Sequence, residues 1–279
     1  MGLPMAGHLL AGGHRLVVHS RTRSKADDLL ARGAVWADSP ATAAEQADVV
    51  FICVTDTPDV QAVMLGDKGI ASTNRSGLIV VDHSTISPAA TKQMAEAFAT
   101  KDMRFLDAPV SGGDVGARNA TLSIMVGGDE AAYQQIAPLL KLMGKTITYC
   151  GPSGCGQLTK LVNQIIVTLT NLAVSEGLSF ALSNSLDPQK TLDAVGGGAA
   201  GSWQLQNLGP KMIKGDFTPG FMIDLQQKDL RLVMEAASQS DISLPGVALV
   251  HQLFALAQKQ GMGKLGTQAL FTVLQKLQS

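Results

Sequence analysis

The spacing of apolar residues changes near the middle of the chain. Over about the first 150 residues, short apolar runs of strand length alternate with segments in which apolar residues recur every three or four positions. The runs that predict strands occupy residues 16–19, 49–54, 78–82, 104–108 and 122–126. This alternation is typical of an α/β fold with a doubly wound, mostly parallel sheet that carries helices on both faces.

Beyond Gly156 the pattern is helical throughout. Apolar residues recur every three or four positions without an intervening proline, which predicts one long helix at about 156–184. The glycine-rich stretch 196–201 is expected to connect helices, because no strand precedes it. We therefore predict two domains, an α/β domain at 1–152 and an all-α domain at 153–279; with 46% hydrophobic content the chain can form two such cores.

Composition narrows the classes of partner. A net charge of −1 and 4% aromatic residues argue against a nucleic-acid surface. The three cysteines form no C-x-x-C pair, which predicts free thiols and a cytoplasmic, reducing compartment; Cys150 or Cys155 as a nucleophile lacks an evident histidine base. Scattered histidines predict no metal site, and no apolar run reaches the ~20 residues of a membrane span. Small molecules are the expected partners.

Lys160 and Asn163 are the first candidate site residues. Three glycines precede them at positions 151, 154 and 156, and the two side chains project from the same face of the expected long helix. An ammonium and a carboxamide placed in this way could converge on one oxygen-bearing group. The alternative is an ordinary lysine on a solvated surface.

The amino-terminal segment has the features of a phosphate-binding helix start. Gly2, Leu3 and Pro4 enter a helix that ends near residues 12–13, where a doubly wound sheet holds a pyrophosphate on free N–H groups. The printed sequence starts at what would be the last glycine of a G-x-G-x-x-G loop. A preceding strand and two glycines are therefore expected to be missing.

A basic segment follows the strand expected at 16–19. A dinucleotide fold presents an acid at this point when it binds the adenosine ribose of NAD(H). Here the chain has Arg21, Thr22, Arg23 and Lys25 instead, which suit a 2′-phosphate and favour NADP(H) over NAD(H). A solvated basic helix start is the alternative.

Three motifs together resemble one enzyme family. They are Asp-Ala-Pro-Val-Ser-Gly-Gly-Asp-Val-Gly-Ala at 107–117, the glycine-lysine-asparagine segment at 151–163, and the segment at 216–230. The chain resembles the β-hydroxyacid dehydrogenases (3-hydroxyisobutyrate dehydrogenase-like), nearest the tartronate semialdehyde and glyoxylate reductase branch. The resemblance implies a Rossmann-type NADP-binding domain, here without its first strand, followed by a helical substrate and dimerisation domain.

The resemblance also implies roles for individual residues. Lys160 would act as the general acid, with Asn163 fixing the substrate oxygen or the ammonium. Further cofactor contacts are implied for Val54, Thr55, Thr85 and Lys228, and substrate contacts for Thr85, Ser111, Gly112, Gly113, Phe221 and Asp229. Two positions depart from the family pattern: Asn119 replaces a usual glycine, and Gln164 replaces a frequent second asparagine.

Three functions follow from these observations. The first is an NADPH-dependent reductase of a small semialdehyde or 2-oxo acid, forming homodimers or homotetramers. The second is a relative that has lost cofactor binding with its phosphate loop and serves as a structural subunit. The third is an imine reductase, against which Lys160 counts. Tartronate semialdehyde, glyoxylate and related acids differ by one or two heavy atoms, so the sequence leaves the substrate open.

Overall fold

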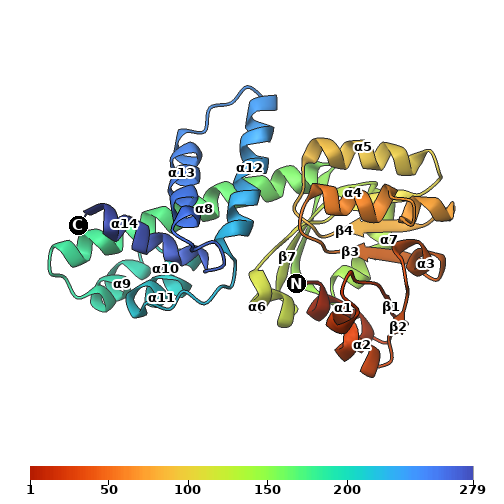
Figure 1. Ribbon diagram of the computed structural model, residues 1–279, viewed down its shortest axis with the longest axis horizontal. Helices are drawn as coiled ribbons and strands as arrows, with labels where there is room; N and C mark the ends of the chain where they lie inside the picture. Colours follow the sequence, from red (N-terminus) through yellow and green to blue (C-terminus); the bar gives the residue numbers. More distant parts are fainter. Residues whose placement is uncertain (279) are drawn as a thin grey trace. The chain divides into compact units, whose positions relative to one another are not determined.

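A computed structural model describes residues 1–278. The chain divides into two compact units, Met1–Lys160 and Leu161–Ser279, which we call the sheet unit and the helical unit. The division falls inside α8 (Cys155–Ser183), a single helix that matches the one expected at 156–184. Figure 1 shows the helices and strands of the two units.

The sheet unit contains eight strands among its described residues. They are β1 (Val17–Val18), β2 (Val35–Trp36), β3 (Val49–Ile52), β4 (Ile79–Asp82), β5 (Arg104–Asp107), β6 (Val110–Ser111), β7 (Leu122–Gly128) and β8 (Gly144–Gly151). Its helices are α1 (Gly2–Ala11), α2 (Asp27–Ala31), α3 (Pro40–Glu45), α4 (Thr57–Leu65), α5 (Pro88–Ala99), α6 (Gly113–Arg118) and α7 (Glu130–Leu140), with 3-10 turns η1 (Arg23–Ala26) and η2 (Ile70–Thr73). All five expected strands are present, and β2, β6 and β8 add to them.

Helices cover both faces of the larger sheet, which confirms the doubly wound prediction. Side chains alternate along β4, so Ile79 and Val81 pack in one core with α1, α6 and α7. Val80 lies in the other core with α3, α4 and α5. Figure 1 shows α4 and α5 over the strands that they cover.

Strand direction changes within the larger sheet. Its order is β3-β4-β5-β7-β6, with β8 also paired to β7. The strands β3, β4 and β5 are parallel, whereas β7 runs antiparallel to β5 and β6. The loops that follow β3, β4 and β5 therefore lie along the same edge of the sheet, because these three strands are parallel.

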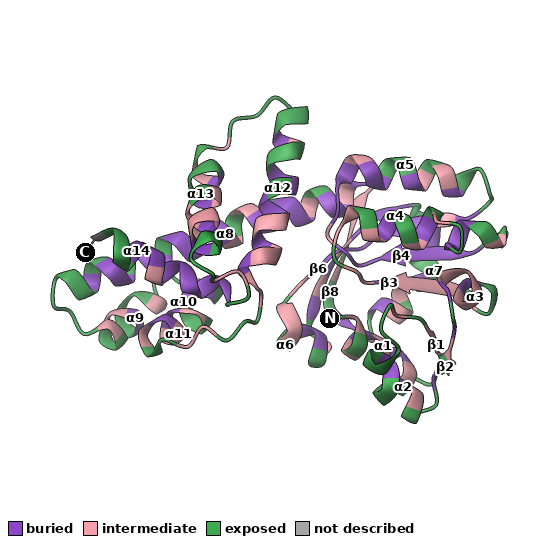
Figure 2. Cartoon of the chain, viewed as in Figure 1, coloured by how far each residue is buried: buried purple, intermediate pink, exposed green. Residues whose placement is uncertain are grey.

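The β1 and β2 strands form a separate parallel pair, without a described backbone bond to β3. Side chains nevertheless join β1 to the β3 side at both ends: Arg15 donates to Gln46 at 3.4 Å, and Arg21 donates to Asp59 at 2.9 Å. The continuous apolar run of β3 is typical of a strand buried in a parallel sheet. Its first three residues are only half-buried, whereas β4 is buried throughout (Figure 2). Among the described residues, no strand therefore lies between β1 and β3.

The helical unit is built around α8. Its other helices are α9 (Pro188–Gly196), α10 (Trp203–Asn207), α11 (Gly209–Lys214), α12 (Ile223–Gln239), α13 (Pro245–Lys259) and α14 (Leu270–Gln278), with a 3-10 turn η3 (Thr267–Ala269). Leu161 and Leu172 of α8 pack with α12, α13 and α14. Val174 and Leu178 pack with α9, α10 and α11. The glycine-rich stretch connects α9 to α10, as expected.

By length and composition alone, α8 is apolar enough to cross a membrane. In the described structure, however, 44% of its most apolar window is buried inside the protein. Both cores of the helical unit also include α8 residues. The helix therefore has the setting of a core helix in a folded protein.

Candidate active site

Asp107 anchors the start of α8 in the sheet unit. It ends β5, is fully buried, and accepts hydrogen bonds from the backbone N–H of Gly154 at 2.9 Å and of Gln157 at 2.8 Å. A helix start has unpaired N–H groups and favours negative charge, so the carboxylate satisfies both needs. Burial raises the pKa of Asp107, and these N–H groups oppose that rise.

Two glycines make this close approach possible. A Cβ on Gly156 would lie 2.5 Å from the carbonyl oxygen of Met125 and 2.6 Å from that of Asp107. A Cβ on Gly127 would lie 2.6 Å from the backbone nitrogen of Gly156. No side chain fits at these distances, so glycine is required where α8 starts against β5 and β7.

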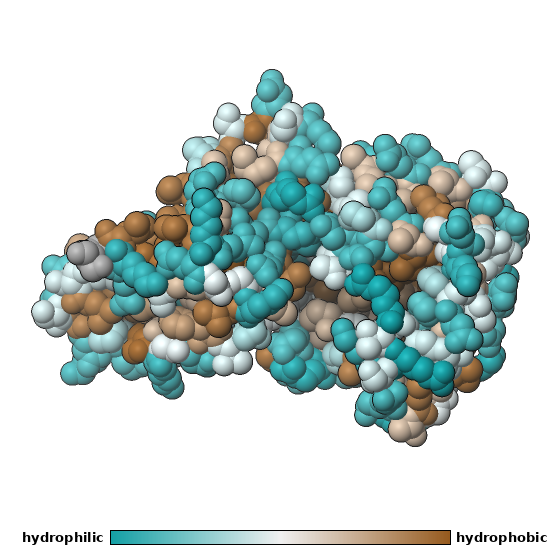
Figure 3. Space-filling view, viewed as in Figure 1, coloured by the Kyte–Doolittle hydropathy of each residue, from teal (hydrophilic) through white to brown (hydrophobic). Residues whose placement is uncertain are grey.

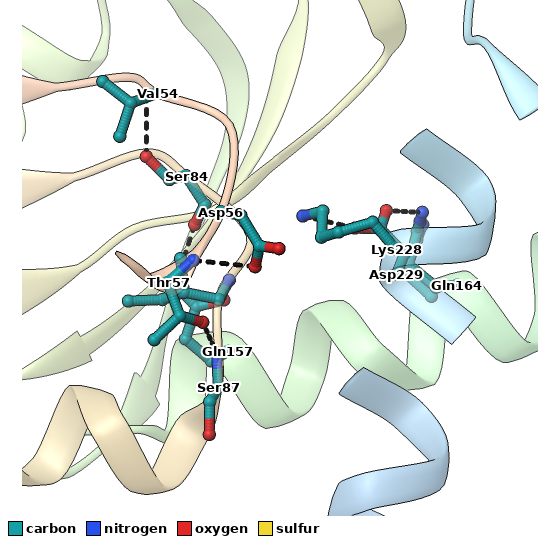
Figure 4. Close-up of polar contacts among 11 residues, drawn as sticks. Val54, Asp56, Thr57, Ser84, Ser87, Gln157, Gln164, Lys228 and Asp229 are labelled. Carbon is teal, nitrogen blue, oxygen red and sulfur yellow. Dashed lines mark hydrogen bonds and ion pairs between the residues drawn. The ribbon is translucent and has the colours of Figure 1, made fainter. Parts of the chain in front are cut away.

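Gln157 ties the same helix turn to the loop after β4. Its Nε2 donates to the Ser84 carbonyl at 2.8 Å, and its Oε1 accepts from the backbone of Ile86 at 3.1 Å. Ser84 in turn accepts from the backbone N–H of Val54 at 2.9 Å (Figure 4). The loops after β3 and β4, which carry the expected cofactor residues, are thereby fixed to the helix that carries Lys160.

A second set of contacts orders the loop after β3. Asp56 caps α4 by accepting from the N–H of Thr57 at 2.7 Å, and Thr57 accepts from the N–H of Ser87 at 3.1 Å. Thr85 is half-buried between these anchored positions. The structure thus places Val54, Thr55 and Thr85 on loops held by hydrogen bonds at the carboxyl ends of parallel strands, where such sheets bind ligands.

Lys160 lies in the second turn of α8 and is 7% exposed. This burial excludes the solvated-surface alternative. A lysine is rarely buried to this degree unless it is paired with polar or charged groups. Asn163, three residues further along the same helix, is half-buried.

The turn after β6 has the backbone that the glycines at 112 and 113 permit. Their φ angles are 130° and 62°, in the region that side chains disfavour. Ser111 and Gly113 are half-buried, and Gly112 is exposed. Successive N–H groups in such a turn can face an anion.

The amino-terminal helix has the geometry for one end of a dinucleotide. Gly2 lies against the end of β3, since a Cβ there would be 3.4 Å from Cβ of Cys53. No side chain caps the start of α1. The backbone N–H of Gly2 faces the Cys53 thiol, and Pro4 has no N–H, so it can contribute only shape to a phosphate site at this helix start. Arg21, Thr22 and Lys25 follow β1 and are exposed. These residues fit a phosphorylated dinucleotide.

In the helical unit, Asp229 is the centre of a second polar group. It is 2% exposed, accepts from Gln164 Nε2 at 2.5 Å, and pairs with Lys228 Nζ at 2.7 Å (Figure 4). Gln164 Oε1 accepts from Asn163 Nδ2 at 2.7 Å. The glutamine that departs from the family pattern therefore connects two expected site residues. Phe221 is half-buried just before α12.

Some residues of these networks were not singled out from the sequence. Asp107 and Gln157 stand in the quoted motifs, but their partners lie 47 to 73 residues away. His83 is buried, stacks on Phe51 with ring centroids 5.6 Å apart, and donates from Nδ1 to the Ala108 carbonyl at 2.6 Å. Only a signal for long-range contact could have identified these roles.

The three cysteines are free. Burial raises the pKa of the Cys53 thiol to about 11, which keeps it protonated at neutral pH. Within the described residues, no group of three or more His, Cys, Asp or Glu side chains could hold a metal ion.

Comparison with known proteins agrees with this architecture. Residues 1–151 match the NAD binding domain of 6-phosphogluconate dehydrogenase, and residues 154–274 match the NAD-binding domain of NADP-dependent 3-hydroxyisobutyrate dehydrogenase. The chain is 44% identical over 275 residues to 2-hydroxy-3-oxopropionate reductase of Escherichia coli, covering 99% of this chain and 94% of that one. It is 44% identical over 278 residues to a probable 3-hydroxyisobutyrate dehydrogenase-like protein of Arabidopsis thaliana, covering 99% and 83%.

Solved structures give the same result. A 3-hydroxyisobutyrate dehydrogenase of Salmonella typhimurium superposes with a TM-score of 0.87 at 28% identity, over 98% of this chain and 95% of that one. The protein Psf3, in complex with NADP+ and 2-OPP, reaches 0.90 at 31% identity, over 98% and 96%. Imine reductases are 20–21% identical with TM-scores of 0.64–0.66, which shows a shared fold alone.

The Rossmann-type sheet, the helical second unit and the lysine-bearing helix define an NAD(P)-dependent oxidoreductase. More specifically, the chain belongs to the β-hydroxyacid dehydrogenase family, whose members include 3-hydroxyisobutyrate dehydrogenase and 2-hydroxy-3-oxopropionate (tartronate semialdehyde) reductase.

Proposed function

We propose that this protein reduces a small semialdehyde or 2-oxo acid, such as tartronate semialdehyde or glyoxylate, with NADPH. The observation that carries the proposal is the burial of Lys160 on a helix whose start is anchored by Asp107 and Gln157. The 44% identity to 2-hydroxy-3-oxopropionate reductase supports this substrate class.

When bound, NADPH supplies the hydride that reduces the carbonyl carbon. Negative charge then grows on the substrate oxygen, and the Lys160 ammonium stabilises this charge and donates a proton to the oxygen. Asn163 orients that oxygen without adding charge. Ser111 and the N–H groups of Gly112 and Gly113 bind the substrate carboxylate, and Phe221 and Asp229 complete its contacts.

In the sheet unit, the proposed cofactor contacts all come from segments at the carboxyl edge of the parallel strands. Gly2 and Leu3 hold a phosphate at the start of α1, with Pro4 shaping the turn. Arg21, Thr22 and Lys25 bind the 2′-phosphate, because a guanidinium, a hydroxyl and an ammonium replace the acid that favours NAD(H). Val54, Thr55 and Thr85 contact the nicotinamide half, and Lys228 is proposed as a further cofactor contact.

A homo-oligomer in the cytoplasm is part of the proposal. Val162, Ile166 and Phe180 of α8 are 55%, 60% and 68% exposed. Figure 3 shows apolar surface on the helical unit. Exposed apolar side chains of this size commonly mark protein interfaces, and a second copy is the most frequent occupant in soluble proteins.

The second candidate is a structural subunit that does not bind cofactor. In the described residues no strand pairs with both β1 and β3, so whether this side of the sheet holds a dinucleotide has to be measured directly.

Calorimetric titration of NADPH and NADH distinguishes the two candidates. Micromolar NADPH binding, much weaker NADH binding and turnover of tartronate semialdehyde or glyoxylate would support the reductase. The absence of binding by either cofactor would exclude it and favour the structural role. A panel that adds succinic semialdehyde, methylmalonate semialdehyde and 3-hydroxyisobutyrate would identify the substrate.

A further inference from the structure

Arg21, on which the proposed NADP(H) preference depends, already has an acidic partner. Its Nη1 donates to Asp59 Oδ1 at 2.9 Å. Arg21 follows β1, whereas Asp59 lies in the first turn of α4, which follows β3. The ion pair therefore joins two segments that leave the carboxyl ends of parallel strands, the edge at which a doubly wound sheet binds a dinucleotide.

The neighbouring charges have other contacts. The Arg23 guanidinium lies 5.2 Å from the ring centroid of Trp36, and the Trp36 Nε1 donates to Asp38 at 2.7 Å. Asp56 accepts from the N–H of Thr57 and caps α4. Asp59 is thus the carboxylate that the structure places directly on the arginine expected to meet the 2′-phosphate.

We propose that Asp59 competes with the 2′-phosphate of NADP(H) for Arg21 and thereby narrows the discrimination between NADPH and NADH. This inference rests on the proposed NADP(H) site. The Arg21 side chain is 76% exposed and that of Asp59 29% exposed, so their ion pair is of the weak, solvated kind. A phosphate monoester carries nearly two charges and binds a guanidinium bidentately, so it displaces the carboxylate.

Displacement leaves Asp59 beside a doubly charged group. The repulsion acts on NADPH and not on NADH, since NADH has a hydroxyl at this position. A neutral isostere at position 59 should therefore strengthen the binding of ligands that carry the 2′-phosphate and leave the binding of other ligands unchanged. If Asp59 instead held Arg21 in position, the same substitution would weaken the binding of the 2′-phosphorylated ligands.

The test uses the full chain and two short probes, 2′,5′-ADP and 5′-AMP, which differ in the 2′-phosphate. Asp59→Asn should lower the Kd of 2′,5′-ADP by about 3- to 10-fold at low salt and change that of 5′-AMP by less than about twofold. The difference in 2′,5′-ADP affinity between Asp59→Asn and the wild type should shrink as salt is added, because salt screens the repulsion between Asp59 and the 2′-phosphate. Asp67→Asn is the matched control, because it removes the same charge from an exposed residue just beyond α4 and should change neither probe.

Arg21→Ala separates this inference from the proposed function. Weaker 2′,5′-ADP binding in Arg21→Ala, with unchanged or weaker binding in Asp59→Asn, would overturn the role of Asp59 and leave the NADP(H) preference standing. Equal binding of 2′,5′-ADP by Arg21→Ala and the wild type, or no binding by either, would overturn the NADP(H) site and the inference with it. Thermal melting of each variant confirms that it is folded.

Discussion

Asp107 and Asp229 are both buried acids in the family motifs, but the two units hold them differently. Asp107 accepts from main-chain N–H groups at the start of α8. Asp229 is held by the side chains of Lys228 and Gln164. Main-chain donors keep their places as long as the helix exists, whereas side chains can exchange partners by changing rotamer. The first arrangement suits an anchor, and the second suits a site that must rearrange around substrate.

The largest expected effect comes from Lys160, one turn beyond the Asp107 anchor. Lys160→Met should lower kcat by about 10²- to 10³-fold or more, because it removes both the oxyanion donor and the proton donor. Steady-state kinetics measures kcat, and thermal melting shows that the variant is folded, since methionine has a chain of similar length to the apolar part of lysine.

Lys141→Met is the control for Lys160, because Lys141 is an exposed lysine at the end of α7. Its kcat should match that of the wild type. A Lys160→Met enzyme that kept kcat within tenfold would show that another group protonates the substrate.

The anchor itself can be removed with Asp107→Ala. Two buried N–H groups then lose their acceptor, so the free energy of unfolding should fall by about 2–4 kcal/mol, and kcat should fall because the start of α8 is no longer fixed. Denaturant titration measures the first quantity. Asp129→Ala, which removes an exposed cap from α7, should cost only about 1 kcal/mol and leave kcat unchanged. Equal losses in the two variants would contradict the anchoring role.

His83 gives the sheet unit a pH dependence. Burial lowers its pKa from 6.5 to about 4. The unfolded chain binds a proton below pH 6.5 that the folded chain accepts only near pH 4, so the free energy of unfolding should fall as pH falls through this window, by up to about 3 kcal/mol. His83→Gln should flatten the dependence between pH 6.5 and 4.5, whereas the exposed His14→Gln should not. Parallel curves for wild type and His83→Gln would assign the slope to other groups.

The smallest expected effect concerns Asp229, the acid that is held by side chains. Gln164→Leu removes the link between Asn163 and Asp229, so kcat/KM should fall by about 3- to 10-fold with a stability loss of about 1 kcal/mol. Gln164→Asn keeps both hydrogen-bonding groups on a shorter arm and should recover most of the activity. Equal activity losses in the two variants would mean that side-chain volume, and not the hydrogen bonds, matters here.

Much of the architecture was predictable because its signals are local. The expected strands at 49–54, 78–82 and 104–108 correspond to β3, β4 and β5, since a parallel strand buried on both faces is one continuous apolar run. The long helix was predicted from its apolar spacing to within a residue at each end. In contrast, β2 and β6 are only two residues long and β8 carries exposed polar positions, so their pairing depends on distant strands.

The sequence by itself determined the fold class, the family and the residue types in the candidate site, because periodicity and motif spacing are properties of short segments. Only the tertiary structure decided which hydrogen-bond and ion-pair partners these residues have. It placed Asp107 and Gln157 at the start of α8, joined Gln164 to Asp229 and set Asp59 on Arg21. The partners in these contacts lie 38 to 65 residues apart, with Gln157 to Asp107 at 50. Contacts over such separations exist only once packing has closed the intervening chain, so no local pattern encodes them.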